Sequence, residues 1–182
     1  MESDTDQALL ERYRNGDRAA FADLVIRYQR PIYNAAFWVL RRAEDANDVT
    51  QTVFLKVAER LDEYDPNYKF FSWIYRIAVN ESLNLLRRNG REEAMDDEID
   101  LPDGERANPE WQVGAAQLSR RIQSTLMRMT THDRMVLTLR HFSECSYQEI
   151  GEILELDEKT VKSRLYEARH RLRELLKDLR PD

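Results

Sequence analysis

Residues 146–176 read SYQEIGEILELDEKTVKSRLYEARHRLRELL, and this stretch decides the fold of the C-terminal part of the chain. Ser146, with Glu149 three residues later, is a capping box, which marks the start of a helix. Glu155-Leu156-Asp157 is short enough to be a turn, and Asp157 can cap a second helix. In that second helix apolar residues recur at helical spacing: Val161, Leu165, Ala168, Leu172 and Leu176. Two helices across a turn of this length predict a helix-turn-helix.

The second of these helices is strongly basic. From Lys159 to Arg173 it holds six Lys or Arg residues against one acid, Glu167. Phosphate binding needs a positive surface, and base reading needs donors near the helix N-terminus. A lone basic helix is more often a solvated amphipathic face. The capped helix and tight turn before this one favour binding to duplex DNA instead.

Composition limits the fold class. Of 182 residues 42% are hydrophobic and 34% are charged, Gly and Pro number five each, and strand-like alternation is rare. We therefore expect an all-α protein of two small helical domains. The lone Cys145 excludes an internal disulfide and is typical of a reducing, cytoplasmic location. The N-terminus is too acidic for a signal peptide, and no apolar run approaches the ~18 residues of a membrane span.

An acidic segment separates two helical regions. Residues 92–110 carry nine Asp or Glu against Arg106 alone, and they include two prolines and a glycine. This composition predicts a flexible linker at 92–113 between domains at 1–91 and 114–182. We expect the linker to be mobile in the free protein, so that proteolysis there leaves two folded fragments. In an alternative interpretation its charge mimics DNA and shields a basic face.

The first domain is predicted to begin with three short helices. Ala8–Tyr13 and Phe21–Tyr28 have apolar residues at helical spacing. Pro31 is predicted to begin the third helix, because proline is favoured in a first helical turn.

A fourth helix, predicted at about Asp45–Leu61, has an unusual exposed side. Asp48 and Gln51 accompany Leu55 there, opposite an apolar core side. One exposed leucine is ordinary. An acid and an amide beside it also fit a docking stripe for a helix of another protein, and the pattern alone leaves both interpretations open.

A polar, aromatic loop at 63–70, EYDPNYKF, precedes a helix predicted at Ser72–Arg88. On the side of this helix away from the core lie Arg76, Asn80, Asn84 and Arg87, with Trp73 at one edge. Asn can hydrogen-bond base edges, Arg binds phosphate, and Trp or Tyr stacks on bases. The alternative is a solvated polar face. The aromatic loop favours nucleic acid, with unstacked bases rather than duplex.

Two more helices are predicted after the linker. Leu118, Ile122, Leu126 and Met129 lie on one face of the first, and the second is predicted at about Asp133–Phe142. With the helix-turn-helix they complete a small four-helix domain.

The chain resembles a bacterial RNA polymerase sigma factor of the extracytoplasmic-function type. Residues 45–54, DANDVTQTVF, and 71–80, FSWIYRIAVN, are similar to domain 2 of that family. SYQEIG at 146–151 and TVKSRL at 160–165 are similar to its domain 4. The two blocks occur in order on either side of a short linker, and the resemblance covers nearly the whole chain.

The resemblance implies three binding surfaces. Residues that would bind the clamp helices of the polymerase β′ subunit are Asp45, Asp48, Gln51 and Leu55. Those that would hold an unpaired base of the promoter −10 element and support strand opening are Asp65, Asn67, Tyr68, Lys69, Phe70, Trp73, Arg76, Asn80 and Asn84. Those that would face the −35 element in the major groove are Lys159, Thr160, Lys162, Ser163, Arg164, Tyr166 and Glu167. The family also implies contact with the polymerase β flap, an anti-sigma factor between the two domains, no metal or other cofactor, and no catalysis.

Three positions depart from the family pattern. Thr130-Thr131 stands where many relatives have a proline. Glu155 occupies a turn position where glycine is common, so a left-handed backbone there would cost about 1 kcal/mol. Glu167 is acidic where some relatives carry arginine; it could accept a hydrogen bond from cytosine or repel phosphate.

Two other classes of protein fit the sequence less well. A regulator that binds duplex DNA without polymerase would explain the helix-turn-helix, but not the Asp48/Gln51 stripe or the loop beside Asn80. An enzyme would need a site such as a metal centre. The three histidines are scattered and none lies near the acids Glu44, Asp45 and Asp48.

Overall fold

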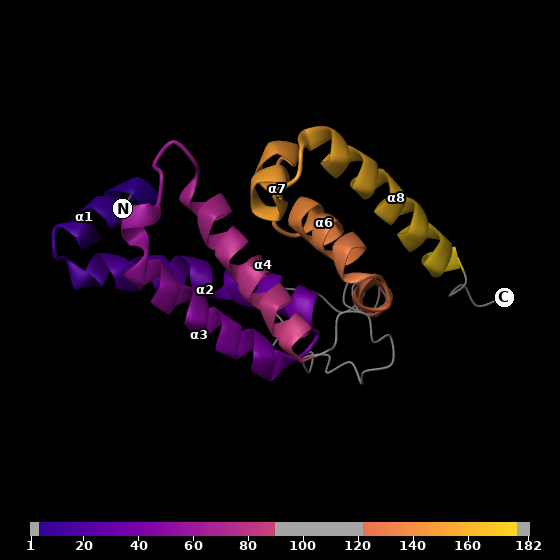
Figure 1. Ribbon diagram of the computed structural model, residues 1–182, viewed down its shortest axis with the longest axis horizontal. Helices are drawn as coiled ribbons and strands as arrows, with labels where there is room; N and C mark the ends of the chain where they lie inside the picture. The colour runs from indigo at the N-terminus through magenta and orange to yellow at the C-terminus, as the bar shows by residue number, and fades with distance from the viewer. Residues whose placement is uncertain (1–3, 90–121, 178–182) are drawn as a thin grey trace.

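The computed structural model describes residues 4–89 and 122–177, and within these ranges every regular element is a helix (Figure 1). The elements are α1 (Asp6–Arg14), α2 (Arg18–Leu40), α3 (Ala43–Glu59), the 3-10 helix η1 (Leu61–Glu63), α4 (Phe70–Arg88), α6 (Thr131–His141), α7 (Tyr147–Leu154) and α8 (Glu158–Lys177). Residues 122–127 are also helical. The expected all-α fold is confirmed. The predicted linker, with its expected mobility, falls outside the described residues.

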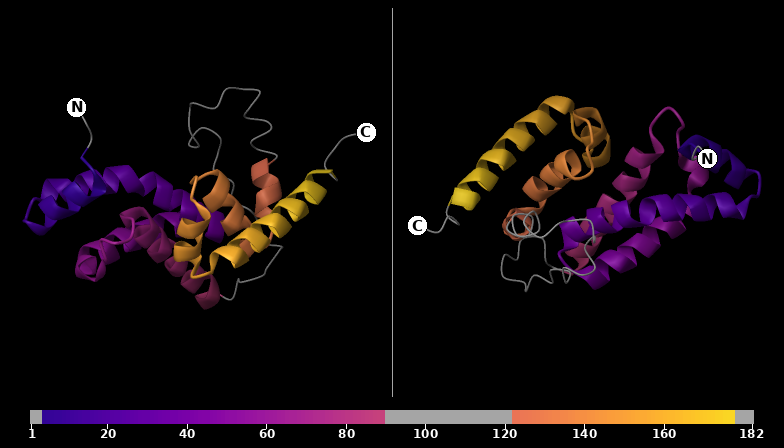
Figure 2. Two further views of the ribbon diagram at one scale, coloured as in Figure 1. Left: turned by 90° about the horizontal axis from the view of Figure 1, so that it is seen from above. Right: turned by 180° about the vertical axis from the view of Figure 1, so that it is seen from behind.

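The helices form two bundles that meet along one face (Figures 1 and 2). In the N-terminal bundle, α1–α4, the long α2 packs against α1, α3 and α4. In the C-terminal bundle, which comprises residues 122–129 and α6–α8, α8 packs against α6 and α7. Between the bundles α4 lies against α7, and α2 lies against α6. The helix-turn-helix and the helix after the aromatic loop are therefore neighbours in space.

The prediction that Pro31 begins a separate helix is wrong, because α2 continues through it. Proline cannot donate a hydrogen bond to the preceding turn, so continuity there has a local cost. A single buried stripe running through both halves of the helix offsets that cost: Ala20, Leu24, Tyr28, Ile32 and Ala36. The stripe faces the other helices of the bundle, and burial of this apolar area holds the two halves in line.

The helix-turn-helix has the predicted local structure. The Ser146 hydroxyl accepts from the Glu149 N–H while the Glu149 carboxylate accepts from the Ser146 N–H, so the capping box is confirmed. Glu155 ends α7 in a left-handed conformation with φ 55°. The Thr160 N–H donates to Asp157 Oδ1 at 2.9 Å, which caps α8 as predicted. These contacts fix the direction in which α8 leaves the turn.

Gly151 allows the turn to fold back closely on α7. The Leu156 N–H donates to the Gly151 carbonyl at 2.9 Å, and a Cβ on Gly151 would lie 2.6 Å from the Leu156 carbonyl oxygen. Gly151→Ala is therefore expected to lower the free energy of unfolding by about 1–3 kcal/mol. Chemical denaturation followed by circular dichroism measures this. Gln148→Ala, exposed on the same helix, should change it by less than about 0.5 kcal/mol, and equal stability of the two variants would contradict the explanation.

Candidate functional site

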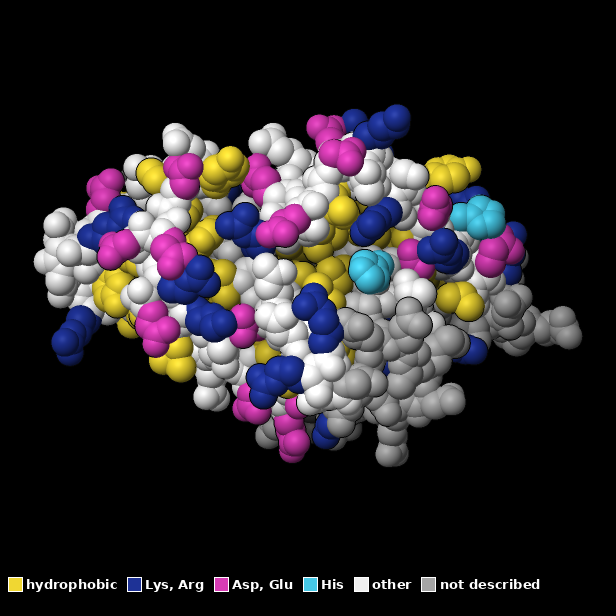
Figure 3. Space-filling view, viewed as in Figure 1, with side chains coloured by type: hydrophobic (Ala, Val, Ile, Leu, Met, Phe, Trp, Pro, Cys, Tyr) yellow, Lys and Arg dark blue, Asp and Glu magenta, His cyan; other side chains and the backbone are white. Residues whose placement is uncertain are grey.

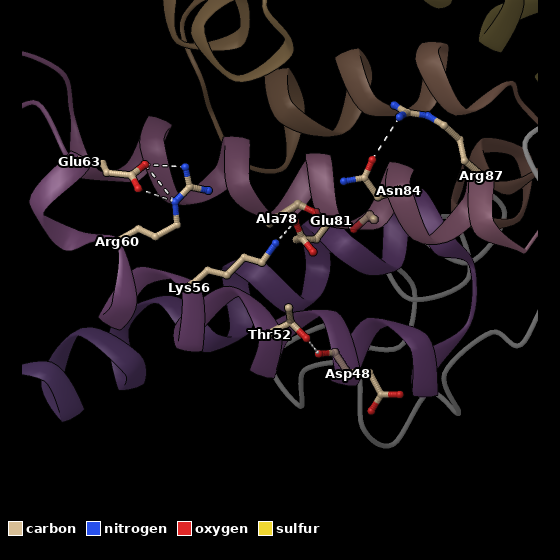
Figure 4. A network of polar contacts seen from close by, with 10 residues as sticks. Asp48, Thr52, Lys56, Arg60, Glu63, Ala78, Glu81, Asn84 and Arg87 are labelled. Carbon is tan, nitrogen blue, oxygen red and sulfur yellow. Dashed lines mark hydrogen bonds and ion pairs between the residues drawn. The ribbon is translucent and has the colours of Figure 1, made fainter.

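The exposed stripe predicted on α3 is present. Asp48 and Gln51 are exposed and Leu55 is 64% exposed, whereas Val49 and Val53 are buried on the opposite side of the helix. Figure 4 shows the Asp48 carboxylate directed away from α4. The stripe thus offers an acid, an amide and an apolar side chain to solvent on a helix anchored by its other face.

Asp45 differs from the other three residues of this predicted surface. It is half-buried, and its carboxylate lies 3.9 Å from Arg42 Nε in the first turn of α3. A half-buried ion pair connects the last turn of α3 to α4, because Lys56 Nζ lies 2.5 Å from Glu81 Oε1 (Figure 4). That pair helps to fix the rotation of α3 about its axis, and with it the direction of the stripe.

The aromatic loop before α4 is held by its own polar groups. Asp65 Oδ1 accepts from the Asn67 N–H at 2.9 Å, and the Tyr64 hydroxyl donates to the Tyr68 carbonyl at 2.7 Å. Asp65 therefore shapes the turn, as an Asx-turn residue does. Tyr68 is 55% exposed at the tip of the loop.

The structure places Phe70 in the core, rather than on the predicted DNA surface. Its side chain is 3% exposed, because it begins α4 and points into the N-terminal bundle. Its ring centroid lies 5.8 Å from that of Trp73 and 5.6 Å from that of Tyr64. Phe70 therefore supports the half-buried Trp73 and Tyr64 from beneath. Tyr64 is an aromatic residue of the loop that sequence reasoning left out of the site, although its place beside Asp65 could have suggested it.

A cavity of about 520 Å³ opens beside this aromatic cluster. On the side of the N-terminal bundle it is lined by Tyr68, Ser72, Trp73 and Arg76, among others. The Ser72 hydroxyl is buried and has no hydrogen-bond partner. Ring faces, a guanidinium and an unpartnered hydroxyl together suit a planar, hydrogen-bonding group such as a nucleobase.

Asn80 and Asn84 lie further along α4, and both are exposed. Asn84 Oδ1 accepts from Arg87 Nη1 at 3.1 Å (Figure 4), so this amide is already engaged within its own helix. Asn80 is the nearer of the two to the cavity in sequence, one turn after Arg76. Apart from the buried Phe70, the structure thus separates the predicted −10 residues into a loop with its cavity and a polar ridge along α4.

The first half of α8 carries the predicted −35 surface. Lys159, Lys162, Ser163 and Tyr166 are exposed, and Tyr166 is 74% exposed, while the opposite side of the helix is buried in the bundle. Lys162 Nζ lies 2.6 Å from Glu158 Oε1, and this hydrogen bond raises the pKa of the Lys162 ammonium. The side chain is therefore charged and held near the start of the helix.

Two residues of this predicted surface have structural contacts of their own. The Thr160 hydroxyl donates to Asp157 Oδ2 at 2.6 Å as part of the helix cap, and Arg164 is half-buried. Glu167 Oε2 accepts from Arg171 Nη2 at 3.4 Å. Glu167 thus has an intramolecular partner in addition to the two roles that its charge suggested.

Two basic residues in the second half of α8 contact α6, although both are exposed. Arg171 Nη1 donates to both carboxylate oxygens of the buried Asp133, at 2.6 and 2.7 Å. Arg169 lies against His141. The pKa of the His141 imidazole is lowered, mainly by its burial and to a smaller extent by the nearby charge of Arg169. Arg169 and Arg171 are therefore exposed residues whose contacts also join α8 to α6.

Other kinds of site are not found in the described part of the chain. There, no group of three or more His, Cys, Asp or Glu side chains is arranged to hold a metal ion. Over residues 4–89 and 122–177, no helix is both long and apolar enough to cross a bilayer.

Family models match both bundles. The model for sigma-70 region 2 matches residues 24–92, and that for sigma-70 region 4 matches residues 119–172. The chain is 32% identical to the ECF RNA polymerase sigma factor SigW of Bacillus subtilis, over 93% of this chain and 96% of that protein. It is 34% identical to the ECF RNA polymerase sigma-E factor of Escherichia coli, over 91% of each.

Solved structures agree with these matches. The structure of CnrH in complex with the cytosolic domain of CnrY aligns with a TM-score of 0.73 at 27% identity, covering 97% of this chain and all of that one. The sigma factor RpoE of Bartonella quintana, solved with the anti-sigma factor NepR, shares the fold with a TM-score of 0.69 at 22% identity, covering 88% of this chain and 98% of that one. From these similarities over nearly its whole length, together with the two bundles and their surfaces, the chain belongs to the extracytoplasmic-function family of RNA polymerase sigma factors.

Proposed function

We propose that this sigma factor directs core RNA polymerase to promoters by binding the −10 element with its N-terminal bundle and the −35 element with its C-terminal bundle. The observation that carries the proposal is the presence of two unlike DNA surfaces on separate bundles: an aromatic cavity beside α4 and an exposed basic helix start on α8. It works in the cytoplasm, where core polymerase and promoters are, and performs no chemistry of its own.

At the −10 element the cavity holds one unpaired base. Trp73 and Tyr68 offer ring faces, Ser72 offers its unpartnered hydroxyl, and Arg76 offers a positive charge to the backbone. Stacking on aromatic side chains contributes about 1–3 kcal/mol per base. Binding of an extruded base favours the melted state over the duplex, because the duplex presents no unstacked base.

At the −35 element the start of α8 enters the major groove. Lys162, Ser163 and Tyr166 are exposed there, and α7 crosses behind them, which is the usual docking geometry of a helix-turn-helix. When DNA binds, the Lys162 ammonium leaves the Glu158 carboxylate and contacts a base edge or a phosphate instead. Tyr166 supplies an apolar contact of the kind that thymine methyl groups make.

Polymerase binds the stripe on α3, where Asp48, Gln51 and Leu55 accept the β′ clamp helices, and the C-terminal bundle contacts the β flap. An anti-sigma factor is proposed as a further partner. CnrH, a relative of known structure, was solved with a partner domain bound to it. A regulator that binds duplex DNA without polymerase is not favoured, because it leaves the α3 stripe and the cavity without a role.

Run-off transcription tests the proposal. The chain is combined with core RNA polymerase from a bacterium whose sigma factors it resembles and with a library of promoter fragments. Transcripts that start at defined positions, and that require the chain, are the expected result. Absence of any chain-dependent start across the library, with a second sigma factor active in the same mixture, would refute the function.

Lys162→Ala is expected to weaken −35 recognition by the holoenzyme. A good base contact in the major groove discriminates by about 1–3 kcal/mol, so affinity for the selected promoter should fall by roughly 5- to 150-fold. Any phosphate contact that is lost should also reduce the salt dependence of binding. Gel shifts at several salt concentrations measure both effects.

Lys177→Ala is the matched control for this substitution. Lys177 ends the same helix and forms an exposed ion pair with Glu174 at 2.9 Å, much as Lys162 does with Glu158. It should change affinity little. Equal losses in the two variants would mean that α8 acts through general charge rather than through a contact at its start.

A further inference from the structure

Two cations lie over the ring of Tyr147, the first residue of α7. The guanidinium carbon of Arg140, in the last turn of α6, is 5.1 Å from the ring centroid. The ammonium of Lys162, in the first half of α8, is 5.5 Å from the same centroid. A cation within about 6 Å of an aromatic ring is attracted by the negative charge of the ring face. The ring of Tyr147 is therefore a point at which α6, α7 and α8 meet.

The position of this ring is fixed by its surroundings. Tyr147 is half-buried against the core, and it follows Ser146, whose hydroxyl caps α7. Arg140 Nη1 donates to the Cys145 carbonyl at 2.8 Å, which ties this cation to the connection that leads into α7. Lys162, in contrast, is exposed, and a lysine side chain is long and flexible. The ring is thus a fixed surface on which the ammonium of a flexible side chain rests.

Lys162 has two partners, and their effects on DNA binding should be opposite. The Glu158 carboxylate, 2.6 Å from the ammonium, competes with phosphate for Lys162 and repels phosphate itself. In Figure 3 acidic and basic side chains lie together at the top of the view, over the turn that begins α8. The Tyr147 ring carries no net charge, and its contact leaves the three N–H donors of the ammonium available for hydrogen bonds. Of the two contacts, only the one with the ring can persist when the ammonium turns to DNA.

A contact that persists favours binding for an entropic reason. Fixing a long side chain at a DNA surface costs rotamer entropy, and a side chain already held near its bound position loses less. The ring also directs the side chain, because it keeps the ammonium near the first residue of α7. A donor that is confined in this way reaches fewer base edges than a freely moving donor, so its choice among bases becomes sharper.

We propose that Tyr147 is a positioning residue for −35 recognition, whose ring holds the Lys162 ammonium where it contacts the promoter and whose hydroxyl is not needed. The proposal rests on the proposed function, in which Lys162 contacts the −35 element. It adds a residue of α7 to a surface that otherwise lies on α8.

Core packing is the simpler explanation for a half-buried tyrosine. In that case Lys162 lies over the ring only because the two side chains are neighbours. The explanations differ once Lys162 is truncated. Packing stabilises the bundle whether or not Lys162 is present, whereas a ring that acts through Lys162 loses its effect on DNA binding with that side chain.

A double-mutant cycle, made in the full chain bound to core polymerase, separates the two explanations. Tyr147→Leu is combined with the native chain and with Lys162→Ala, and gel shifts measure the affinity of each holoenzyme for the selected promoter. In the native chain Tyr147→Leu should weaken binding by about two- to fivefold, the range for a cation over a ring at an exposed site. In the Lys162→Ala chain it should cause no further loss. Equal losses in both chains, or no loss in the native chain, would overturn the proposal.

Tyr147→Phe is the matched control, because it removes the hydroxyl and keeps the ring. Its affinity should stay close to that of the native chain. A loss as large as that of Tyr147→Leu would overturn the proposal, since the hydroxyl rather than the ring would then be responsible.

Ring fluorination gives a test that does not depend on how well Tyr147→Leu folds. Phenylalanine analogues with increasing numbers of ring fluorines at position 147 keep the shape of the ring and progressively weaken the negative charge of its face. Affinity for the promoter should fall steadily along this series in the native chain and stay constant in the Lys162→Ala chain. An affinity that does not change with fluorination in the native chain would refute the role of the ring.

Base preference shows whether the ring acts through Lys162. Promoters with single substitutions in the −35 element identify the position at which Lys162→Ala reduces discrimination. Tyr147→Leu should reduce discrimination at that position and preserve it at the others, and a loss spread over all positions would contradict the proposal. If the native holoenzyme bound promoters without regard to the −35 sequence, the proposed function itself would have failed. If Lys162→Ala had the expected effect while the ring variants matched the native chain, only the positioning role would be refuted.

Discussion

Replacement of Asp48 and Gln51 together by alanine is expected to weaken binding of the chain to core RNA polymerase by about 10- to 100-fold, which is roughly 1.4–2.7 kcal/mol. Both side chains are exposed on α3 while the other side of the helix is buried. Truncation therefore removes contacts with the partner and leaves the core of the bundle intact. Fluorescence anisotropy of the labelled chain, titrated with core polymerase, measures the affinity.

The matched control changes the same residue types elsewhere. Asp23→Ala with Gln29→Ala removes one acid and one amide from the exposed side of α2 and alters net charge equally. It should leave polymerase affinity unchanged. Unchanged affinity in the Asp48/Gln51 variant as well would show that the stripe is only a solvated face. Circular dichroism should show native helix content in both variants.

Asn80→Ala is expected to reduce open-complex formation by the holoenzyme by about tenfold, through loss of about 1–3 kcal/mol of base contacts. Asn80 is exposed on α4, one turn beyond Arg76 at the cavity. It lies on the other bundle from α8, so duplex −35 binding should be untouched. The defect should shrink on a template already melted around the −10 element, because the free energy of unpairing is then supplied in advance.

Permanganate footprinting on closed and pre-melted templates measures this effect, beside gel shifts for −35 binding. Asn34→Ala is the control, since Asn34 is exposed on α2 and outside every proposed surface. Impaired −35 binding by Asn80→Ala, or unaltered melting on every promoter tested, would contradict the proposed division of roles between the bundles.

The local structure was largely predictable from the residues. Ser146 and Glu149 form a capping box through contacts within four residues of the chain, and Asp157 caps α8 over a similar span. Glu155 takes the left-handed conformation that commonly ends a helix, although residues other than glycine disfavour it. The apolar periodicity of α3 and α8 likewise separates the exposed Leu55 and Lys162 from the buried Val53 and Leu165.

Predictions failed where distant parts of the chain decide the outcome. Pro31 predicts a helix start, because proline locally interrupts a helix. The buried stripe that packs against the other helices nevertheless keeps α2 continuous. Phe70 reads as part of an aromatic loop, but the cluster with Tyr64 and Trp73 draws its ring inward. In the sequence Arg171 counts only toward the positive charge of its helix, and nothing there shows that a buried carboxylate thirty-eight positions away binds it.

The sequence by itself determined the helices, their caps, the helix-turn-helix and the family, because these depend on contacts within a few residues or on short motifs. Only the tertiary structure decided that Arg134 of α6 caps the end of α2, and that Glu149 lies against Lys69. In both cases the partners are 80 or more residues apart, and the sequence around one partner does not identify the other. Which polar groups meet is set by how two amphipathic bundles bury their apolar faces, and burial is a property of the whole packed chain.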